Sequence, residues 1–503
     1  MEIAEPSATG GRLAPVIARL DAYMRQRLAE GFGPGVAVAL TDHEGLRHLG
    51  SYGLADTGSG RPVTPATLFE IGSIGKSFVA TALLQLHDEG KLDLDAPVTR
   101  YLPWFTVQSD FAPITIHHLL SHSSGLVAGA DTTPSSPYEV WNLRHTATGF
   151  APGTQFWYSN VGYEILGHIL AAVDGRPYAD ALRARVLDPL GMADSEPVIT
   201  QAMRPRLATG YWYRYDDRPT PAAEPPLPAT WVEISAASGS LACTPADLAA
   251  YLRMLLNRGV GPRGPLLSPA SYARMIAPVV PAYDAYSYAY GLFVGHLPER
   301  GGRHIISHAG ETIGYHAVML GDLDAGLGVV LLTNGPEPGM VEAEWILDLF
   351  GGATHGTLLP ELPGPRPVPT VISNATDYAG EYQGTAGSLT VRADGERLLI
   401  DHAGASVPLE RWLGGDSFIV AHPALAHAAL VFSRTDGVVV EAFHGGDWYT
   451  NSRYSGPPSF AYPPEWDAFV GRYRTYSPWM NNFRIVIRKG QLLLQWYGLF
   501  RKT

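Results

Sequence analysis

The chain has 503 residues, 46% of them apolar and 17% charged, with a formal net charge of −12. This composition indicates a globular protein of two or three domains, and the negative charge argues against a nucleic-acid partner. Cys243 is the only cysteine, which excludes an intrachain disulfide and any cysteine-based metal site, and we expect neither a metal nor a cofactor.

The sequence begins without a recognisable targeting signal. Met1–Pro6 lacks the positively charged and apolar regions of a signal peptide. No apolar run elsewhere is long enough to cross a membrane. We therefore expect a cytoplasmic protein with no membrane partner, acting on a small molecule or a short peptide. The oligomeric state is not readable from the sequence.

Hydrophobic patterns predict the elements of a first domain, residues 1–358. Apolar residues at steps of three and four predict an amphipathic helix over 12–30. Apolar runs predict a buried strand at 35–40 and its hairpin partner at 45–54. From residue 65 to about 275 the pattern is mainly helical, and three more strands are expected at 304–306, 315–320 and 327–333. Strands near both ends predict one sheet assembled from both ends, with a large helical insertion.

A proline-rich segment, residues 359–370, predicts a linker. Beyond it, residues 371–503 change to short strands and turns, which is typical of a separate all-β domain, either a barrel or a sandwich. Tyr378–Tyr382 and Phe469–Tyr473 form a faint repeat. Because only about thirty residues follow the second copy, its strands either complete the barrel or form an incomplete second repeat.

Ser73 and Lys76 stand three residues apart at the start of an apolar run. In a helix this spacing places both side chains on one face, one turn apart. A serine hydroxyl needs a neighbouring base to become a nucleophile, and a desolvated lysine amine can be that base, whereas arginine stays charged. A helix N-terminus also favours a developing oxyanion. The spacing therefore predicts a lysine-activated serine nucleophile.

Two other motifs partly match the same residues. Gly75-Lys76-Ser77 fits the end of the phosphate-binding pattern G-x-x-x-x-G-K-[ST], but its first glycine would fall at Glu70, whose carboxylate would repel phosphate. The serine hydrolase elbow G-x-S-x-G fails at Ser73, because Ile71 stands where the pattern needs glycine. The sequence therefore favours the serine–lysine pair.

Two downstream motifs carry further candidate residues. In Tyr158-Ser159-Asn160, which precedes an expected helix, the tyrosine can shuttle a proton and the asparagine can hold a substrate carbonyl and the lysine together. In His308-Ala309-Gly310, which ends an apolar strand, the histidine can donate a hydrogen bond and the glycine lets a substrate backbone approach. Taken alone, each motif also has a plain structural explanation, as a helix start and a strand end.

In this order, the three motifs resemble those of the serine β-lactamase and penicillin-binding-protein superfamily, in the branch of class C β-lactamases, DD-peptidases, D-aminopeptidases and related esterases. Residues 11–350 contain three more stretches that fit this branch: Gly90–Val98, Leu119–Leu126 and Ser238–Leu248. The resemblance implies an α/β catalytic domain, with an antiparallel sheet flanked by helices, followed by a lipocalin-like β-barrel. It also implies that Ser73 is the acylated nucleophile and Lys76 its base, with Tyr158 as proton shuttle and Asn160 as a substrate-orienting residue.

The resemblance further implies which residues meet the substrate. The oxyanion hole would consist of the backbone N–H groups of Ser73 and Glu311, and Gly310 would line the substrate site. His308 stands where β-lactamases usually have lysine, and family members with histidine here are more often peptidases, amidases or esterases. Glu311 replaces the small residue that often follows H-x-G. Its carboxylate either pairs with a substrate ammonium group, as suits a D-aminopeptidase, or is a solvated surface charge.

The sequence thus predicts a serine hydrolase that forms an acyl-enzyme on Ser73 and cleaves an amide or ester bond, as a peptidase or amidase acting on peptides with D-residues. An esterase is an alternative, and so is a thioesterase-like peptide cyclase or transacylase, in which an amine intercepts the same acyl-enzyme. The sequence does not separate these, because the pocket decides which nucleophile enters. A non-catalytic penicillin-binding-type protein is a further alternative, against which the intact reactive positions argue.

Overall fold

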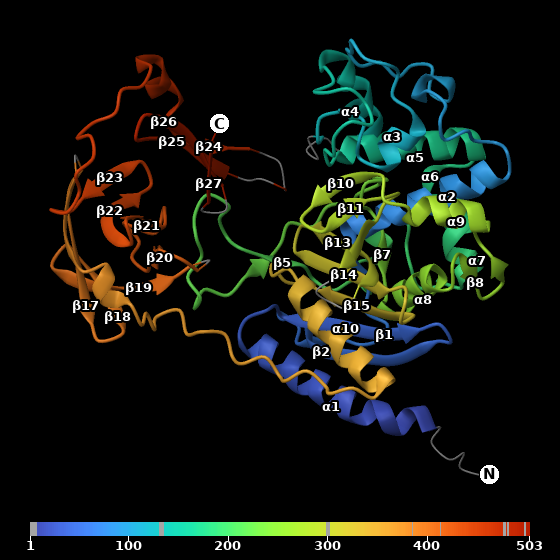
Figure 1. Ribbon diagram of the computed structural model, residues 1–503, viewed down its shortest axis with the longest axis horizontal. Helices are drawn as coiled ribbons and strands as arrows, with labels where there is room; N and C mark the ends of the chain where they lie inside the picture. The colour runs from blue at the N-terminus through green and yellow to red at the C-terminus, as the bar shows by residue number, and fades with distance from the viewer. Residues whose placement is uncertain are drawn as a thin grey trace. The chain divides into compact units, whose positions relative to one another are not determined.

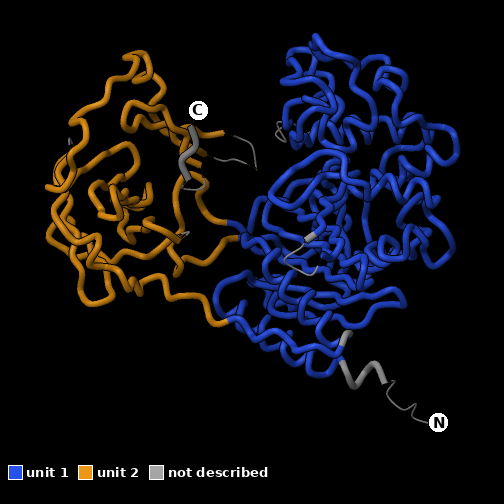
Figure 2. The backbone as a smooth tube through the Cα atoms, viewed as in Figure 1, with its two compact units in different colours: residues 1–212, 228–363 blue, residues 213–227, 364–503 orange. Residues whose placement is uncertain are grey.

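The chain folds into two compact units, one of residues 1–212 and 228–363 and one of residues 213–227 and 364–503 (Figure 2). The computed structural model describes residues 8–129, 135–297, 302–384, 386–412, 414–475, 479, 482–496 and 499–502. Within these ranges, no helix combines the length and the apolar character needed to cross a membrane. The predicted boundaries at 358 and 370 stay predictions, and the structure adds the segment 213–227 to the second unit.

The first unit is built on a nine-stranded antiparallel sheet with the order β10-β11-β12-β13-β14-β15-β1-β2-β3 (Figure 1). β1 (Gly35–Asp42) lies between its hairpin partner β2 (Leu46–Asp56) and β15 (Leu327–Thr333), with Val36 opposite Thr333. The other strands are β3 (Arg61–Pro62), β10 (Val280–Tyr283), β11 (Tyr286–Tyr288), β12 (Phe293–Leu297), β13 (Arg303–Thr312) and β14 (Tyr315–Asp322). The predicted sheet assembled from both ends of the domain is therefore confirmed.

Helices cover both faces of this sheet, because the strands are apolar on both sides. Alternate residues of β1 divide between two cores: Val36, Val38 and Leu40 join the core under α1 (Ala8–Ala29) and α10 (Met340–His355). Ala37 and Ala39 join the core under the helical insertion and α8 (Pro245–Leu256). The predicted helix at 12–30 is α1, and Figure 1 shows it beside α10 on the same face.

The insertion is mainly helical, as predicted. Its helices include α2 (Gly75–Asp88), α3 (Ile116–Leu120), α4 (Ser136–Asn142), α5 (Asn160–Asp174), α6 (Tyr178–Leu182), α7 (Asp188–Leu190) and α9 (Pro269–Ile276). Short strand pairs join them: β4 (Phe69–Glu70) with β7 (Ala242–Cys243), β5 (Tyr211–Trp212) with β6 (Leu227–Pro228), and β8 (Val260–Gly261) with β9 (Gly264–Pro265). α2 is buried over most of its length, which explains its continuous apolar run.

The second unit contains a closed eight-stranded antiparallel barrel, in which β16 pairs with β23 at Gln383–Thr450 (Figure 1). Its strands are β16 (Gly380–Gly384), β17 (Gly387–Asp394), β18 (Arg397–His402), β19 (Ala405–Arg411), β20 (Ser417–Val420), β21 (Leu430–Thr435), β22 (Val438–His444) and β23 (Asp447–Thr450). Large side chains such as Tyr382, Phe418 and Phe432 pack together in its core. Of the two predicted all-β architectures, the domain adopts the barrel.

A separate four-stranded sheet follows, with β24 (Gly471–Arg474), β25 (Asn482–Arg488), β26 (Gln491–Trp496) and β27 (Leu499–Lys502). The chain enters β24 as it enters β16, after a short 3-10 helix. In both places a tyrosine hydroxyl donates to the carbonyl four residues earlier: Tyr382 to Tyr378 at 2.8 Å and Tyr473 to Phe469 at 2.7 Å. The barrel closes without these four strands, and the alternative, an incomplete second repeat, stays a prediction.

Residues 213–227 are part of the second unit because Asp217 binds there. Its side chain is fully buried and pairs with the guanidinium groups of Arg218 at 3.1 Å, Arg472 at 2.8 Å and Arg484 at 3.1 Å. Burial raises the pKa of the Asp217 carboxyl, but the arginines outweigh burial and leave the pKa below its usual value. A fragment ending at residue 358 would therefore keep this segment and lose two of the arginines that hold it.

Replacing Asp217 by Asn should destabilise the second unit strongly. The variant removes the buried carboxylate charge that three partly exposed arginines share, and losing a hydrogen bond to a charged group costs about 1.5–3 kcal/mol. Denaturant unfolding followed by circular dichroism measures the change. Asp401→Asn is the matched control, since Asp401 pairs with Arg392 on the exposed surface of the barrel, and its effect should be far smaller. Equal losses in the two variants would contradict this account.

Candidate active site

The backbone before Ser73 is fixed against the sheet. β4 pairs with β7, and Ile71 N donates to Leu241 O at 2.9 Å, after which η1 (Gly72–Ile74) runs directly into α2. Gly72 has a φ of +50°, and a Cβ there would lie 2.7 Å from the backbone N of Glu311. Only glycine accommodates both conditions, so the residue before the nucleophile is set by the close approach of β13.

Lys76 is fully buried one helical turn after Ser73. Its Nζ donates to Ser73 Oγ at 2.9 Å and to Ser238 O at 2.6 Å, and it lies 4.8 Å from the centroid of the Tyr158 ring. Burial disfavours the charged form of an amine, and two acceptors fix its direction. The arrangement can therefore pass a proton between the serine oxygen and the lysine nitrogen.

Tyr158 and Asn160 flank the N-cap of α5. Ser159 Oγ accepts from Gly162 N at 3.1 Å, and Asn160 N donates to Ala128 O at 2.7 Å, so the loop turns sharply into the helix. The Tyr158 ring lies 6.3 Å from that of His308, and both lie near Lys76. The structure thus brings Ser73, Lys76, Tyr158 and His308 into one cluster from three separate segments.

His308 is buried in β13 and has both ring nitrogens engaged. Nδ1 donates to Ala309 O at 2.6 Å, since a carbonyl can only accept, and Nε2 then accepts from Tyr288 OH at 3.1 Å. Burial and the neighbouring Lys76 lower the pKa of His308 to about 3. The imidazole is therefore neutral near pH 7 and does not substitute for the positive charge of a lysine.

Gly310 lies directly against the nucleophile segment. A Cβ at Gly310 would fall 1.8 Å from Ile71 O and 3.1 Å from Ser73 N. The chain's own backbone therefore requires this glycine, whereas the sequence suggested close approach of a substrate, and that role stays a prediction. The N–H groups of Ser73 and Glu311 lie on these two adjoining segments, as an oxyanion hole would need.

Glu311 lies on the opposite face of β13 from His308 and Gly310, because side chains alternate along a strand. Its side chain is 55% exposed, with Oε2 at 3.6 Å from His316 Nε2. The His316 ring stacks on Trp212 at a centroid distance of 5.8 Å. An exposed carboxylate beside an aromatic pair is available to a cationic group, in contrast to the enclosed Lys76.

Sequence reasoning did not single out Glu164, which supports Lys76 indirectly. Glu164 is buried on α5, where Oε1 accepts from Ser238 N at 2.9 Å and Oε2 accepts from Ser136 Oγ at 2.5 Å. Since Ser238 O holds the Lys76 amine, Glu164 fixes the segment that orients the base. An acidic residue inside an apolar helical run was the available signal. In the described residues, no group of three or more His, Cys, Asp or Glu could hold a metal ion.

His122 was also missed as an individual residue, although the Leu119–Leu126 stretch was noted. Its ring stands 4.1 Å from that of Tyr158, and its Nδ1 accepts from Ser159 N at 3.1 Å. Burial, with smaller contributions from Lys76 and His308, keeps the pKa of His122 well below its usual value. The neutral His122 ring therefore packs against the Tyr158 ring, and its hydrogen bond to Ser159 N holds Tyr158 at the start of α5.

Comparisons with known proteins agree with this geometry. The family model described as Beta-lactamase matches residues 20–353. Penicillin-binding protein 4 of Amycolatopsis lactamdurans is 33% identical over 71% of this chain and 94% of its own length. Esterase EstB of Burkholderia gladioli is 36% identical over 44% of this chain and 62% of its own length.

A solved structure, the D-amino acid amidase from Ochrobactrum anthropi SV3 complexed with D-phenylalanine, aligns with a TM-score of 0.56 and 26% identity. The alignment covers 66% of this chain and 98% of the amidase. The matched residues 20–353 include the whole cluster built around Ser73 and most of the nine-stranded sheet. The chain therefore belongs to the beta-lactamase family, and it is an enzyme of the hydrolase type.

Proposed function

We propose that the protein is a serine hydrolase that forms an acyl-enzyme on Ser73 and acts as a peptidase or amidase on substrates with D-residues. One observation carries the proposal: the fully buried Lys76 amine bonds directly to Ser73 Oγ at 2.9 Å. A buried amine beside a serine hydroxyl is suited to act as a general base at neutral pH.

The proposed reaction has two halves. Lys76 Nζ takes the proton of Ser73 Oγ as the oxygen attacks the substrate carbonyl carbon, and the N–H groups of Ser73 and Glu311 stabilise the oxyanion. The carbon–nitrogen bond breaks as Tyr158 gives a proton to the leaving amine, which leaves an ester on Ser73. Lys76 then passes the serine proton to the Tyr158 oxygen, so that Lys76 is neutral and Tyr158 is protonated again. Water attacks the ester carbonyl and gives one proton to Lys76, which transfers it to Ser73 Oγ as the bond between that oxygen and the acyl carbon breaks and the carboxylic acid leaves.

The substrate class rests on two further arguments. The similarity to a D-amino acid amidase favours an amide whose acyl part is a D-residue. The exposed Glu311 carboxylate next to the proposed oxyanion hole favours a substrate with a free ammonium group.

His308, which is neutral and hydrogen-bonded to Tyr288 and Ala309, holds Tyr288 in place beside the cluster.

An esterase is the second candidate, because 250 residues of the chain align with esterase EstB at 36% identity. The alkoxide or phenoxide that leaves an ester needs protonation less than the amine that leaves an amide. An esterase would therefore depend less on Tyr158. A transacylase or peptide cyclase would use the same acyl-enzyme with an amine in place of water. The cytoplasmic location and the use of a small molecule or short peptide stay predictions.

The first prediction concerns the nucleophile. A fluorophosphonate probe should add its mass to a peptide that contains Ser73, because the activated Oγ attacks phosphorus as it would a carbonyl. Intact-protein and peptide mass spectrometry measure the label. Ser73→Ala should remove the label, whereas Ser77→Ala, in which a buried hydroxyl bonded to Ile74 O is lost, should keep it. Labelling of the Ser73→Ala protein would reject the mechanism.

Lys76→Arg tests whether the amine acts as a base. Arginine keeps the charge and much of the length but cannot give up its proton, so kcat/KM should fall by about 10²–10⁴. Tyr158→Phe, which removes only the phenolic oxygen, should cause a similar loss on amides and a smaller one on p-nitrophenyl esters. A near-native rate in Lys76→Arg would show that charge alone is needed.

Glu311→Gln tests substrate selection. A charged hydrogen bond to a substrate ammonium group is worth about 1–3 kcal/mol, so kcat/KM for free D-amino acid amides should fall about five-fold to a hundred-fold or more. The same amides with an acetylated nitrogen serve as matched controls and should be unaffected. An equal loss on both kinds of amide would reject the ammonium contact and move the esterase candidate ahead.

A further inference from the structure

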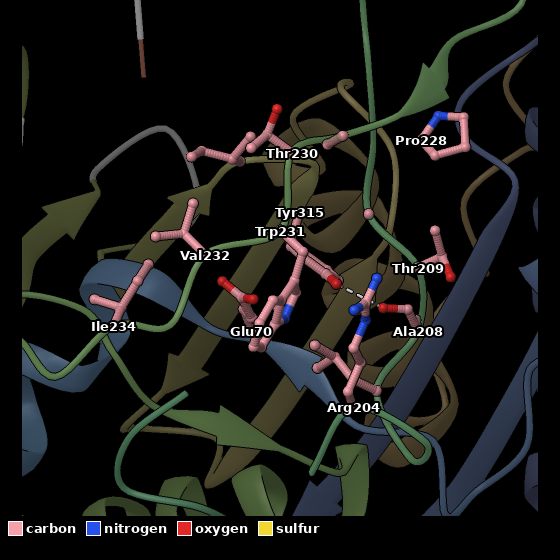
Figure 3. Close-up of a pocket in the computed structure, with 14 residues that line it drawn as sticks. Glu70, Arg204, Ala208, Thr209, Pro228, Thr230, Trp231, Val232, Ile234 and Tyr315 are labelled. Atoms are coloured by element: carbon pink, nitrogen blue, oxygen red, sulfur yellow. Dashed lines mark hydrogen bonds between the residues drawn. The ribbon is translucent and has the colours of Figure 1, made fainter. Parts of the chain in front are cut away.

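A cavity in the first unit has Glu70, three residues before Ser73, in its lining (Figure 3). It has a volume of about 100 Å³ and is lined by residues from β4, β14 and the loops after β6 and after a short 3-10 helix, η5 (Gln201–Met203). Sites for drug-sized ligands enclose about 300–1,000 Å³. This cavity therefore suits only a ligand of a few heavy atoms.

The inner wall of the cavity carries the carboxylate of Glu70. Glu70 is only 5% exposed, and no cation pairs with it in the ranges that the structure describes. Burial raises the pKa of its carboxyl to about 7, and the Thr312 hydroxyl only partly opposes this. Burying an ionised carboxylate without a cation costs free energy. A cationic or hydrogen-bond-donating ligand beside Glu70 would lower this cost.

The cavity lining also contains two hydrogen-bond donors, the side chains of Trp231 and Arg204. Trp231 Nε1 is buried and has no acceptor among the described residues. The Arg204 guanidinium lies 5.0 Å from the centroid of the Trp231 ring. Figure 3 shows the Glu70 carboxylate on one side of this indole and the guanidinium on the other, beside the hydrogen bond from Tyr315 to Ala208. The cavity thus presents a negative group and a positive group to one small space.

We propose that this cavity binds a small free α-amino acid. Its ammonium group would pair with Glu70, and its carboxylate would accept from Trp231 Nε1 and from Arg204. Opposite charges on the two walls favour a zwitterion over a simple amine, which Arg204 would repel, and over a simple carboxylate, which Glu70 would repel. The small volume limits the side chain to one about the size of that of glycine or alanine.

An occupant would touch both segments that line the proposed oxyanion hole. Glu70 precedes Ser73 by three residues, and Thr312, whose hydroxyl lies beside the Glu70 carboxyl, follows Glu311. A free amino acid belongs to the same chemical class as a product of the proposed peptidase or amidase. Binding in this cavity does not rest on that function, however, because it requires neither Ser73 nor turnover.

Isothermal titration of the full chain at pH 8 tests the proposal. Glycine, D-alanine and L-alanine should bind saturably, and methylammonium and acetate should each bind at least tenfold more weakly. Glu70→Gln should weaken alanine binding at least tenfold. Arg204→Gln should weaken alanine binding to a similar degree but leave methylammonium binding equal or stronger. The matched control, Arg206→Gln, removes an exposed arginine paired with Asp194 and should change neither.

Trp231→Phe removes the indole N–H together with the five-membered ring but keeps an aromatic face beside Arg204. It tests the site even if Glu70→Gln fails to fold, and it should weaken alanine binding several-fold. Binding should also weaken as the pH falls below about 7, when Glu70 takes up a proton, while Arg204 stays charged and the pKa of Tyr315 is raised by burial. Absence of saturable binding would overturn the proposal. So would loss of binding in Glu311→Gln with no change in Glu70→Gln, because the amino acid would then occupy the proposed active site.

Discussion

The close contact between the Ile71–Ser73 backbone and β13 is the constraint on which the site depends. Two glycines make it possible: side chains at Gly72 or Gly310 would collide with the backbone of the opposite segment. The contact fixes the position of Ser73 relative to the sheet. It also brings the backbone N–H groups of Ser73 and Glu311 to neighbouring segments. Any substitution that separates these segments would move the nucleophile and the proposed oxyanion donors at once.

The buried amine of Lys76 needs equally firm support, since a flexible lysine in this position would find other acceptors. Ser238 O supplies that support, and Glu164 in turn holds the Ser238 backbone. A main-chain carbonyl therefore helps to orient the amine toward Ser73 Oγ.

Local patterns in the sequence were enough to predict some of these features. The Ser73–Lys76 pair follows from helical spacing alone, and β1, β2, β13, β14 and β15 follow from apolar runs, because both depend on neighbours in sequence. The other strands of the sheet, β3, β10, β11 and β12, were not predicted. Tyr158 and His308 needed a family resemblance, since nothing local says that segments so far apart meet. An acidic residue inside an apolar helical run marked Glu164 as unusual, but its role could not be predicted, because it depends on a contact with Ser238, more than seventy residues later in the sequence.

The second unit shows the same limit at a larger scale. Short strands and turns predicted an all-β domain, but strand patterns do not distinguish a barrel from a sandwich, because closure depends on the pairing of β16 with β23. Residues 213–227 contain little apolar sequence and read as a loop. They belong to the second unit because Asp217 meets Arg472 and Arg484, which no local pattern encodes.

β13 explains how one strand can hold the reaction centre and still allow substrate preference to vary. His308, Gly310 and Thr312 share the buried face, where each is constrained by packing against η1, Tyr288 or Glu70. Glu311 lies on the exposed face, where its carboxylate approaches His316 at 3.6 Å. A change on the buried face would disturb the nucleophile segment, whereas a change of the Glu311 side chain would leave the backbone N–H in place. Strand alternation therefore separates the contacts that fix the Ser73 segment from the exposed charge that we propose for substrate selection.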